Sequence, residues 1–283
     1  FSMLQLEVEI ESNSGFCFGV RKAIKKAEAV LKNGEELMSL GEIVHNDQEI
    51  KRLEAKGMIT ISKEQFRQVH HKTVLFRAHG EAPESYDIAR RNNITVIDAS
   101  CPIILKLQDK IFQSYQNNEN IYIFGVPNHP EIVALNGKIN NSAHVFEKFE
   151  DLDLGKIPPH ITLYSQTTKS LKQFYHIIEA LRSQGIQVHV VDSICRQVSN
   201  REQELREFCR RFDAIVFVAG QNSSNGKQLY EICRQENVNT NFVSSVEEIK
   251  IGWFSLNQKV GICGATSTPL WLIEQVKEYL LAL

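Results

Sequence analysis

Short apolar runs alternate with amphipathic segments along almost the whole chain. The apolar runs, which this alternation predicts to be strands, cover residues 4–10, 37–40, 73–77, 94–97, 121–124, 161–164, 188–191, 214–219 and 259–263. Segments with helical periodicity predict helices over residues 20–32, 48–56, 83–91, 102–116, 171–183, 201–212, 227–235 and 269–281. Such regular exchange of strand and helix is typical of α/β domains with mainly parallel sheets.

Three cysteines occupy matching places in this pattern. Cys17, Cys101 and Cys195 each follow a predicted strand and precede a helix, and they are spaced by roughly one small α/β unit. We therefore predict three similar α/β domains over residues 4–98, 99–192 and 193–283, with Cys195 at the start of the third. Taken alone, a cysteine such as Cys17 is more often a buried packing residue. Cys209, Cys233 and Cys263 lie inside helix or strand patterns, and ordinary core or surface packing is expected for them.

Polar residues also gather where strands end. These residues are His45, His79, His129, Glu131, the segment 165–168, the segment 222–226 and the segment 266–269. Each short segment alone is an ordinary N-cap or turn sequence. Together, several helix starts with neutral donors indicate an anion site, because free amides and helix dipoles favour negative charge there.

Length, charge and missing motifs argue against several classes of function. The length of 283 residues indicates two or three domains, and the net charge of −2 argues against a protein that mainly grips a nucleic acid or an anionic membrane. We find no apolar run of about 18 residues and no secretion leader, so we expect a cytoplasmic protein with reduced thiols. No Cys-x-x-Cys pair, complete P-loop or Gly-x-Gly-x-x-Gly segment is present.

The ordered set of motifs resembles the 4-hydroxy-3-methylbut-2-enyl diphosphate reductase family of the non-mevalonate isoprenoid pathway, over about residues 4–281. The motifs are Gly15-Phe-Cys17-Phe-Gly-Val, Gly41-Glu-Ile-Val-His45-Asn, Arg77-Ala-His79-Gly, Asp98-Ala-Ser-Cys101-Pro, His129-Pro-Glu131, Ser165-Gln-Thr167-Thr, Ile194-Cys195, Asn222-Ser-Ser-Asn225 and Ser267-Thr-Pro. The resemblance implies three α/β domains in a pseudo-threefold arrangement around a central cluster and substrate cavity.

The resemblance also implies a cofactor and a reaction. Cys17, Cys101 and Cys195 would hold a 4Fe–4S cluster with one open iron, which air degrades to a 3Fe–4S form or removes. The expected reaction is reductive dehydration of the allylic diphosphate to isopentenyl and dimethylallyl diphosphates. An external ferredoxin or flavodoxin with its reductase would supply two electrons, since the chain has no flavin or nicotinamide motif. Neither a nucleic acid nor a membrane is expected as a partner.

Roles for further residues follow from the same resemblance. Glu131 is expected to donate a proton to the leaving hydroxyl, because a carboxyl shielded from water can stay protonated near neutral pH. Thr167 is expected to orient the hydroxyl and relay the proton, and His129 to feed in protons or bind phosphate. The residues expected to hold the diphosphate are His45, His79, His129, Ser223, Ser224, Asn225 and Ser267.

Departures from the family pattern, and two other classes of function, stay open at this point. Ala134 and Lys138 replace a glycine and a glutamine, Val198 stands where a threonine is expected, and Leu270 replaces an aspartate. One alternative function is a hydrolase or transferase that uses Cys17 or Cys101 as nucleophile with a histidine base. The other is a phosphate-binding protein without catalysis.

Overall fold

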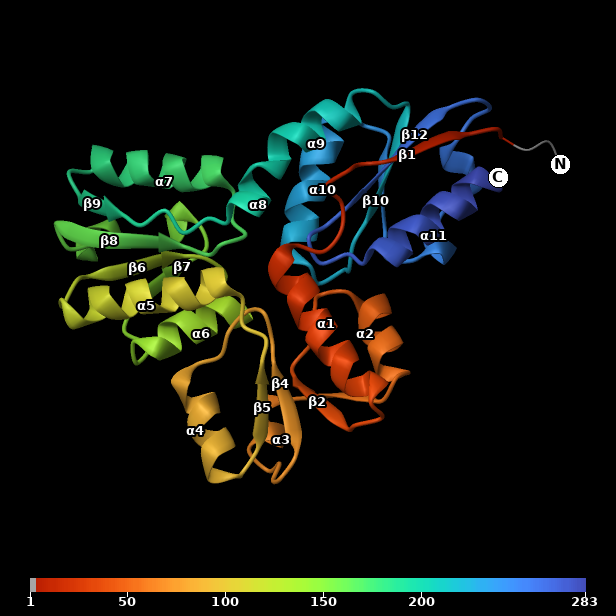
Figure 1. The fold of residues 1–283 in the computed structure, drawn as a ribbon. Coiled ribbons are helices and arrows are strands. Elements are labelled where there is room, and N and C mark those ends of the chain that lie inside the picture. Colours follow the sequence, from red (N-terminus) through yellow and green to blue (C-terminus); the bar gives the residue numbers. More distant parts are fainter. Residues whose placement is uncertain (1–3) are drawn as a thin grey trace. The chain divides into compact units, whose positions relative to one another are not determined.

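The computed structural model describes residues 4–283, and Figure 1 shows the helices and strands along the chain. The described residues divide into two compact units. One unit contains the described residues up to Ile24 together with residues 42–58 and 200–283, and the other contains residues 25–41 and 59–199. Within the described residues, no helix is long and apolar enough to cross a membrane.

Three parallel four-stranded sheets form the framework of the described chain. Sheet A has the order β11 (Thr240–Val243), β10 (Ala214–Val218), β12 (Lys259–Gly264), β1 (Glu7–Ile10). Sheet B has the order β3 (Met58–Ile61), β2 (Leu37–Leu40), β4 (Thr73–Phe76), β5 (Thr95–Asp98). Sheet C has the order β7 (His144–Phe146), β6 (Ile121–Phe124), β8 (His160–Ser165), β9 (Gln187–Val190). The parallel α/β class predicted from the alternation is confirmed.

The three sheets share one topology, and this changes the assignment of the first strand. In sheets B and C the four strands follow one another in sequence, with the second at one edge and the fourth at the other. In sheet A the fourth place is taken by β1, which pairs in parallel with β12 from Glu7–Lys259 to Ile10–Ile262. The expected domain of residues 4–98 placed β1 with sheet B, and the pairing with β12 corrects this.

Helices begin where the sequence supplies a start signal. Pro83 and Pro102 open α4 (Pro83–Arg91) and α5 (Pro102–Gln116), and Ser223 caps α10 (Ser224–Glu236) through Gly226 N–H. The other α-helices are α1 (Phe18–Lys32), α2 (Asp47–Glu54), α3 (Lys63–Phe66), α6 (Pro130–Lys138), α7 (Leu171–Ser183), α8 (Arg196–Ser199), α9 (Arg201–Cys209) and α11 (Leu270–Leu281). Short 3-10 turns occur at Phe149–Asp151, Leu154–Lys156, Val246–Glu248 and Ile251–Trp253.

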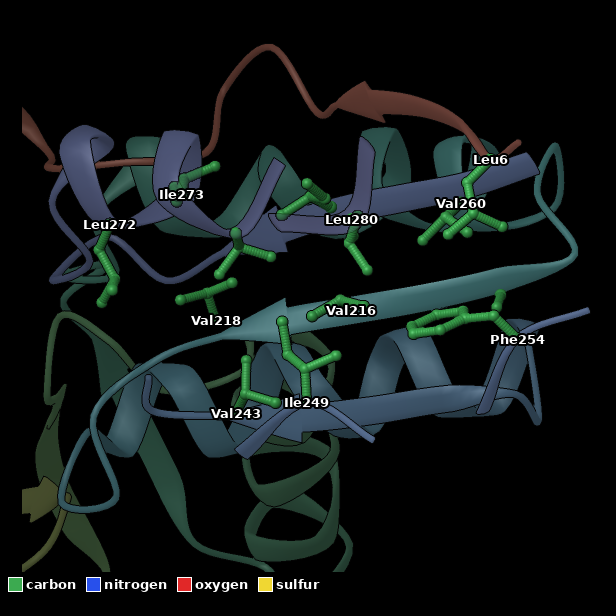
Figure 2. Close-up of a cluster of buried hydrophobic side chains, with 13 residues drawn as sticks. Leu6, Val216, Val218, Val243, Ile249, Phe254, Val260, Leu272, Ile273 and Leu280 are labelled. Carbon is green, nitrogen blue, oxygen red and sulfur yellow. The ribbon is translucent and has the colours of Figure 1, made fainter. Parts of the chain in front are cut away.

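The cores lie on the faces of the sheets. Alternate residues of β10 point to opposite faces, so that Val216 and Val218 belong to one apolar cluster and Ile215 and Phe217 to another. Figure 2 shows the first cluster, in which β10 and β12 pack against α11. Burial on both faces explains why the central strands read as continuous apolar runs in the sequence.

Candidate active site

The three cysteines singled out in the sequence have the same local geometry. Each follows the fourth strand of its sheet: Cys17 after β1, Cys101 after β5 and Cys195 after β9. The N–H groups of the three cysteines donate to the carbonyls of Thr266, Ala78 and Thr167 at 2.9, 3.0 and 2.9 Å. Each acceptor lies two residues past the end of the neighbouring third strand.

The carbonyl of each cysteine begins the helix that follows. These carbonyls accept from the N–H groups of Arg21, Leu105 and Ser199, at 2.9, 3.0 and 3.0 Å. All three cysteines are half-buried. The predicted equivalence of the three strand ends is thus confirmed for the backbone, and each thiol is carried on a rigid strand-to-helix turn.

A second set of cysteines meets inside the unit that contains sheet A. The sulfur atoms of Cys209, Cys233 and Cys263 all lie within 4.8 Å of one another. All three residues are fully buried in the apolar cluster between sheet A and helices α9 and α10. Of the two kinds of packing expected from the sequence, core or surface, the structure shows core packing, and the proximity of the three sulfur atoms was not predicted.

Glu131 is held by Thr167 in a buried pair. Thr167 N–H donates to Oε1 of Glu131 and its hydroxyl Oγ1 donates to Oε2, both at 2.7 Å. Glu131 lies in the first turn of α6 and is only 2% exposed. Burial raises the pKa of this carboxyl to about 7, although both hydrogen bonds from Thr167 favour its charged form. A proton can therefore be held or released here near neutral pH.

Two cysteines lie in the same unit as this pair. Burial raises the pKa of the Cys195 thiol above its usual value, and the charges of Cys101 and Glu131 add to the effect. Backbone N–H groups of Gln197 and Val198 oppose it. Because Thr167 also accepts the Cys195 N–H through its carbonyl, the proton-holding pair and two candidate metal ligands converge in one unit.

His129 and His79 lie in the same unit as Glu131 and Thr167. His129 caps α6, and its Nδ1 accepts from the N–H of Glu131 at 3.2 Å. Its ring meets the ring of His79 edge-on, with centroids 5.4 Å apart. The cap fixes the orientation of the His129 imidazole at the start of α6.

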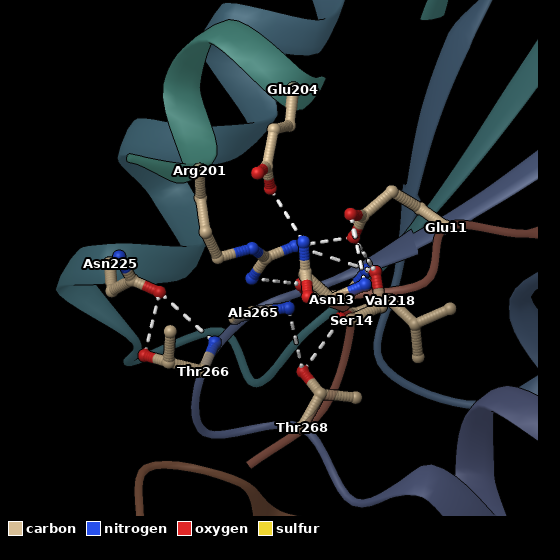
Figure 3. A network of polar contacts seen from close by, with 11 residues as sticks. Glu11, Asn13, Ser14, Arg201, Glu204, Val218, Asn225, Ala265, Thr266 and Thr268 are labelled. Atoms are coloured by element: carbon tan, nitrogen blue, oxygen red, sulfur yellow. Dashed lines mark hydrogen bonds and ion pairs between the residues drawn. The ribbon is translucent and has the colours of Figure 1, made fainter. Parts of the chain in front are cut away.

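Hydroxyl and amide groups expected to bind the diphosphate gather in the other unit. The hydroxyls of Ser223 and Ser267 are 3.0 Å apart. Oδ1 of Asn225 accepts from the N–H and hydroxyl of Thr266, at 3.1 and 2.9 Å (Figure 3). The Nδ2 donor of Asn225 is buried without a partner among the described residues. A buried donor of this kind is expensive unless a ligand satisfies it.

His45 and Cys17 belong to the same unit as this cluster. A Cβ at Gly220 would lie 2.3 Å from the carbonyl oxygen of His45, so only glycine permits this close approach to the end of β10. Thr266 joins Cys17 to Asn225, since its carbonyl accepts from Cys17 and its N–H donates to Asn225. Ser224 is half-buried and opens α10.

Sequence reasoning missed a buried ion pair behind the Cys17 turn. Arg201 Nη2 donates to Oε2 of Glu11 at 2.8 Å, and its Nη1 donates to the carbonyl of Gly264 at 3.0 Å (Figure 3). Ser14 donates to the same carboxylate at 2.7 Å and accepts from the Gly264 N–H. The only signal was a carboxylate directly after an apolar strand, which the sequence pattern does not connect to Arg201.

The departures from the family pattern lie at varied places. Ala134 and Val198 are buried, whereas Leu270 is half exposed at the start of α11. Lys138 places its Nζ over the ring of Phe112, 5.5 Å from the centroid.

Comparison with known proteins gives one family over almost the whole chain. The family model described as LytB protein matches residues 8–281. A protein from Bacteroides fragilis named 4-hydroxy-3-methylbut-2-enyl diphosphate reductase is 45% identical over 280 residues, covering 96% of this chain and 97% of its own. A protein of the same name from Parabacteroides distasonis is 47% identical and covers 96% of each chain.

Solved structures agree with the sequence relatives. The structure of (E)-4-hydroxy-3-methyl-but-2-enyl diphosphate reductase, described as the terminal enzyme of the non-mevalonate pathway, superposes with a TM-score of 0.73 at 31% identity. It covers 98% of this chain and 99% of its own. The Plasmodium falciparum reductase superposes with a TM-score of 0.86 at 27% identity and covers 98% and 88%. The resemblance proposed from the motifs is confirmed.

Proposed function

The chain belongs to the LytB protein family, and we propose that it reduces 4-hydroxy-3-methylbut-2-enyl diphosphate to isopentenyl and dimethylallyl diphosphates. The allylic C–O bond breaks, a C–H bond forms, and the hydroxyl leaves as water. Two electrons and two protons are consumed. The names of the relatives and the pairing of Glu131 with Thr167 beside Cys101 and Cys195 support this reaction over a hydrolase or a non-catalytic receptor.

We propose that Cys17, Cys101 and Cys195 hold an iron–sulfur cluster of the 4Fe–4S type. Three soft thiolates on rigid and equivalent backbone turns are a suitable donor set for iron, and ligation by three rather than four would leave one iron open. When bound, this group would supply electrons to the substrate and Lewis acidity to its hydroxyl. The chain's own residues must then place the substrate and move the protons.

The second cysteine set is a poor candidate for the same task. Cys209, Cys233 and Cys263 are fully buried among apolar side chains, so a substrate hydroxyl could not reach an iron bound there. Burying three thiolates in such a core would also carry a large desolvation cost. Half-burial of Cys17, Cys101 and Cys195 is compatible with access to substrate.

Glu131 is proposed to provide the proton for the leaving hydroxyl. With a pKa near 7, a substantial fraction of Glu131 is protonated at neutral pH. The protonated carboxyl would donate to Oγ1 of Thr167, which frees the threonine hydrogen to point at the substrate oxygen. Concerted movement of the two hydrogens then protonates the hydroxyl as the C–O bond breaks. His129, whose Nδ1 accepts from the backbone N–H of Glu131, is proposed to replace the lost proton.

The diphosphate is proposed to be held by hydroxyl, amide and imidazole donors. The donors are His45, His79, His129, Ser223, Ser224, Asn225 and Ser267. The unpaired Nδ2 of Asn225 is the strongest single indication, because a phosphate oxygen would satisfy it. This set contains no lysine or arginine, in agreement with the near-neutral charge of the chain.

Anaerobic reconstitution tests the proposed function directly. Protein reconstituted with iron and sulfide should be brown, contain about four irons per chain and convert the substrate to both products with viologen reduced by dithionite. A colourless protein that stays free of iron after reconstitution, or a loaded protein that leaves the substrate unchanged, would contradict the proposal.

A further inference from the structure

Helix α1 exposes a cationic face that begins directly after Cys17. Five of its residues, Phe18, Arg21, Lys22, Lys25 and Lys32, are exposed and recur three, four or seven residues apart along the helix. This spacing puts them on one face together with the exposed Ala29, while Ala23, Ala27 and Leu31 are buried on the opposite side. Phe18, the residue after Cys17, is 55% exposed.

The charge of this face is unbalanced. The structure assigns no ion pair to Arg21, Lys22, Lys25 or Lys32 among the described residues. The only carboxylate of α1 is the half-buried Glu28. Arg21 donates to the carbonyl of Phe16, and none of the four cations has an ion-pair partner in the part of the chain that the structure describes. Since the whole chain carries a net charge of −2, these four cations on one helix face form a local positive field.

The other two helices that follow candidate ligands differ from α1. The first three turns of α5, after Cys101, expose Asp109 beside two lysines and the apolar Ile103 and Leu105. Helix α8, after Cys195, has four residues, and its Arg196 is paired with Asp192. An uninterrupted cationic face next to a candidate cluster ligand therefore occurs only at α1 among these three helices.

We propose that the exposed face of α1 is the docking surface for a small acidic one-electron carrier protein of the ferredoxin kind. This inference rests on the proposed function, which needs two electrons from outside the chain. Complementary charge speeds the encounter and fixes the orientation of weak redox complexes. A carrier seated on the first turn of α1 is adjacent in the chain to Cys17. Two successive reduced carriers would each deliver one electron, which balances the two-electron reduction of the substrate.

A charge-reversal variant with two electron sources tests the surface. Arg21→Glu, Lys22→Glu and Lys25→Glu are combined, and turnover is driven either by a purified acidic ferredoxin with its reductase or by viologen reduced with dithionite. We expect kcat/KM for ferredoxin at low salt to fall by about tenfold or more and to lose its dependence on ionic strength. Turnover with viologen, which does not need a protein surface, should stay within about twofold of the original.

A matched variant controls for the change in net charge. The changes Lys148→Glu, Lys156→Glu and Lys172→Glu alter three exposed lysines outside α1 by the same total charge. They should leave both reactions unchanged.

The proposal is overturned if the α1 variant keeps its ferredoxin kinetics or loses no more turnover than this control. It is also overturned if turnover falls equally with both electron sources, since α1 would then act on the cluster. Absence of viologen-driven turnover in the original chain would instead reject the proposed function. A parallel series uses flavodoxin in place of ferredoxin. If the α1 variant loses turnover only with flavodoxin, the choice of ferredoxin as the carrier is overturned.

Discussion

Thr167 binds both carboxyl oxygens of Glu131, one through its N–H and one through its hydroxyl, at 2.7 Å each. The backbone bond fixes the carboxyl, and the hydroxyl bond connects it to a group that can rotate. Since burial raises the pKa of Glu131 to about 7, the pair holds a proton under conditions in which an exposed glutamate would have lost it.

The pH dependence of turnover follows from this pair. Turnover of the reconstituted enzyme should fall as pH rises through about 7, because Glu131 loses the proton that it must donate. Glu131→Gln should keep iron and substrate binding while kcat falls by about a hundredfold or more. A rate that is independent of pH between 6 and 8.5, or normal turnover in the glutamine variant, would show that another group is the acid.

The stability of the protein should depend on the same proton. Below about pH 4.5 Glu131 is protonated in both the folded and the unfolded protein. Between pH 4.5 and 7 it loses the proton only in the unfolded protein, so the free energy of unfolding falls as pH rises. The full cost, about 3 kcal/mol at most, is present above pH 7. Glu131→Gln lacks this dependence, so thermal melts should favour the variant increasingly from pH 5 to 8. A constant difference between the two proteins would contradict the raised pKa.

Asn225 gives a test of the diphosphate site that preserves the fold. Asn225→Asp keeps the oxygen that accepts from Thr266 and replaces the unpaired Nδ2 donor by a second carboxylate oxygen. Repulsion of the diphosphate should raise KM by about tenfold or more without loss of iron. Asn222→Asp, at an exposed position of the same loop, is the control. Equal KM values for the two variants would remove Asn225 from the site.

The ion pair behind the Cys17 turn should contribute strongly to stability. Arg201→Met leaves Glu11 as a buried charge without its ion-pair partner and should lower the free energy of unfolding by about 3–5 kcal/mol. Adding Glu11→Gln removes that charge and should restore part of the lost stability. Asp87→Asn breaks the exposed pair with Arg90 and should change stability by less than about 1 kcal/mol. Chemical unfolding measures all four proteins. A cost at Arg201 no larger than at Asp87 would contradict the role of the buried pair.

Apolar runs predicted the central strands, whereas three edge strands were missed. Strands β7 and β11 have three or four residues and begin with polar side chains, so they lack a continuous apolar run. Strand β3 is as apolar as the predicted β2, and its pattern does not explain why it was missed. The position of β1 in sheet A also could not be predicted from the apolar pattern. Its partner β12 is nearly the whole chain away, and no periodicity in either segment specifies that register.

The candidate site shows the same division between local and distant information. Cys17, Cys101 and Cys195 could be found because strand ends and helix starts are local signals, and their equivalent backbone anchors follow from the shared topology. The ion pair of Arg201 and Glu11 joins two elements that are separated by most of the chain. Burial of Glu131, which sets its pKa, likewise depends on packing that the sequence does not record.

Iron content of cysteine variants tests the central claim most directly. Single replacements Cys17→Ala, Cys101→Ala and Cys195→Ala are compared with Cys209→Ala, Cys233→Ala and Cys263→Ala after the same anaerobic reconstitution. We predict that each of the first three loses most of its iron and its visible absorbance, while each of the second three keeps about four irons per folded chain. Full iron in any of the first three variants, or loss of iron only in the second three, would contradict the proposed cluster site.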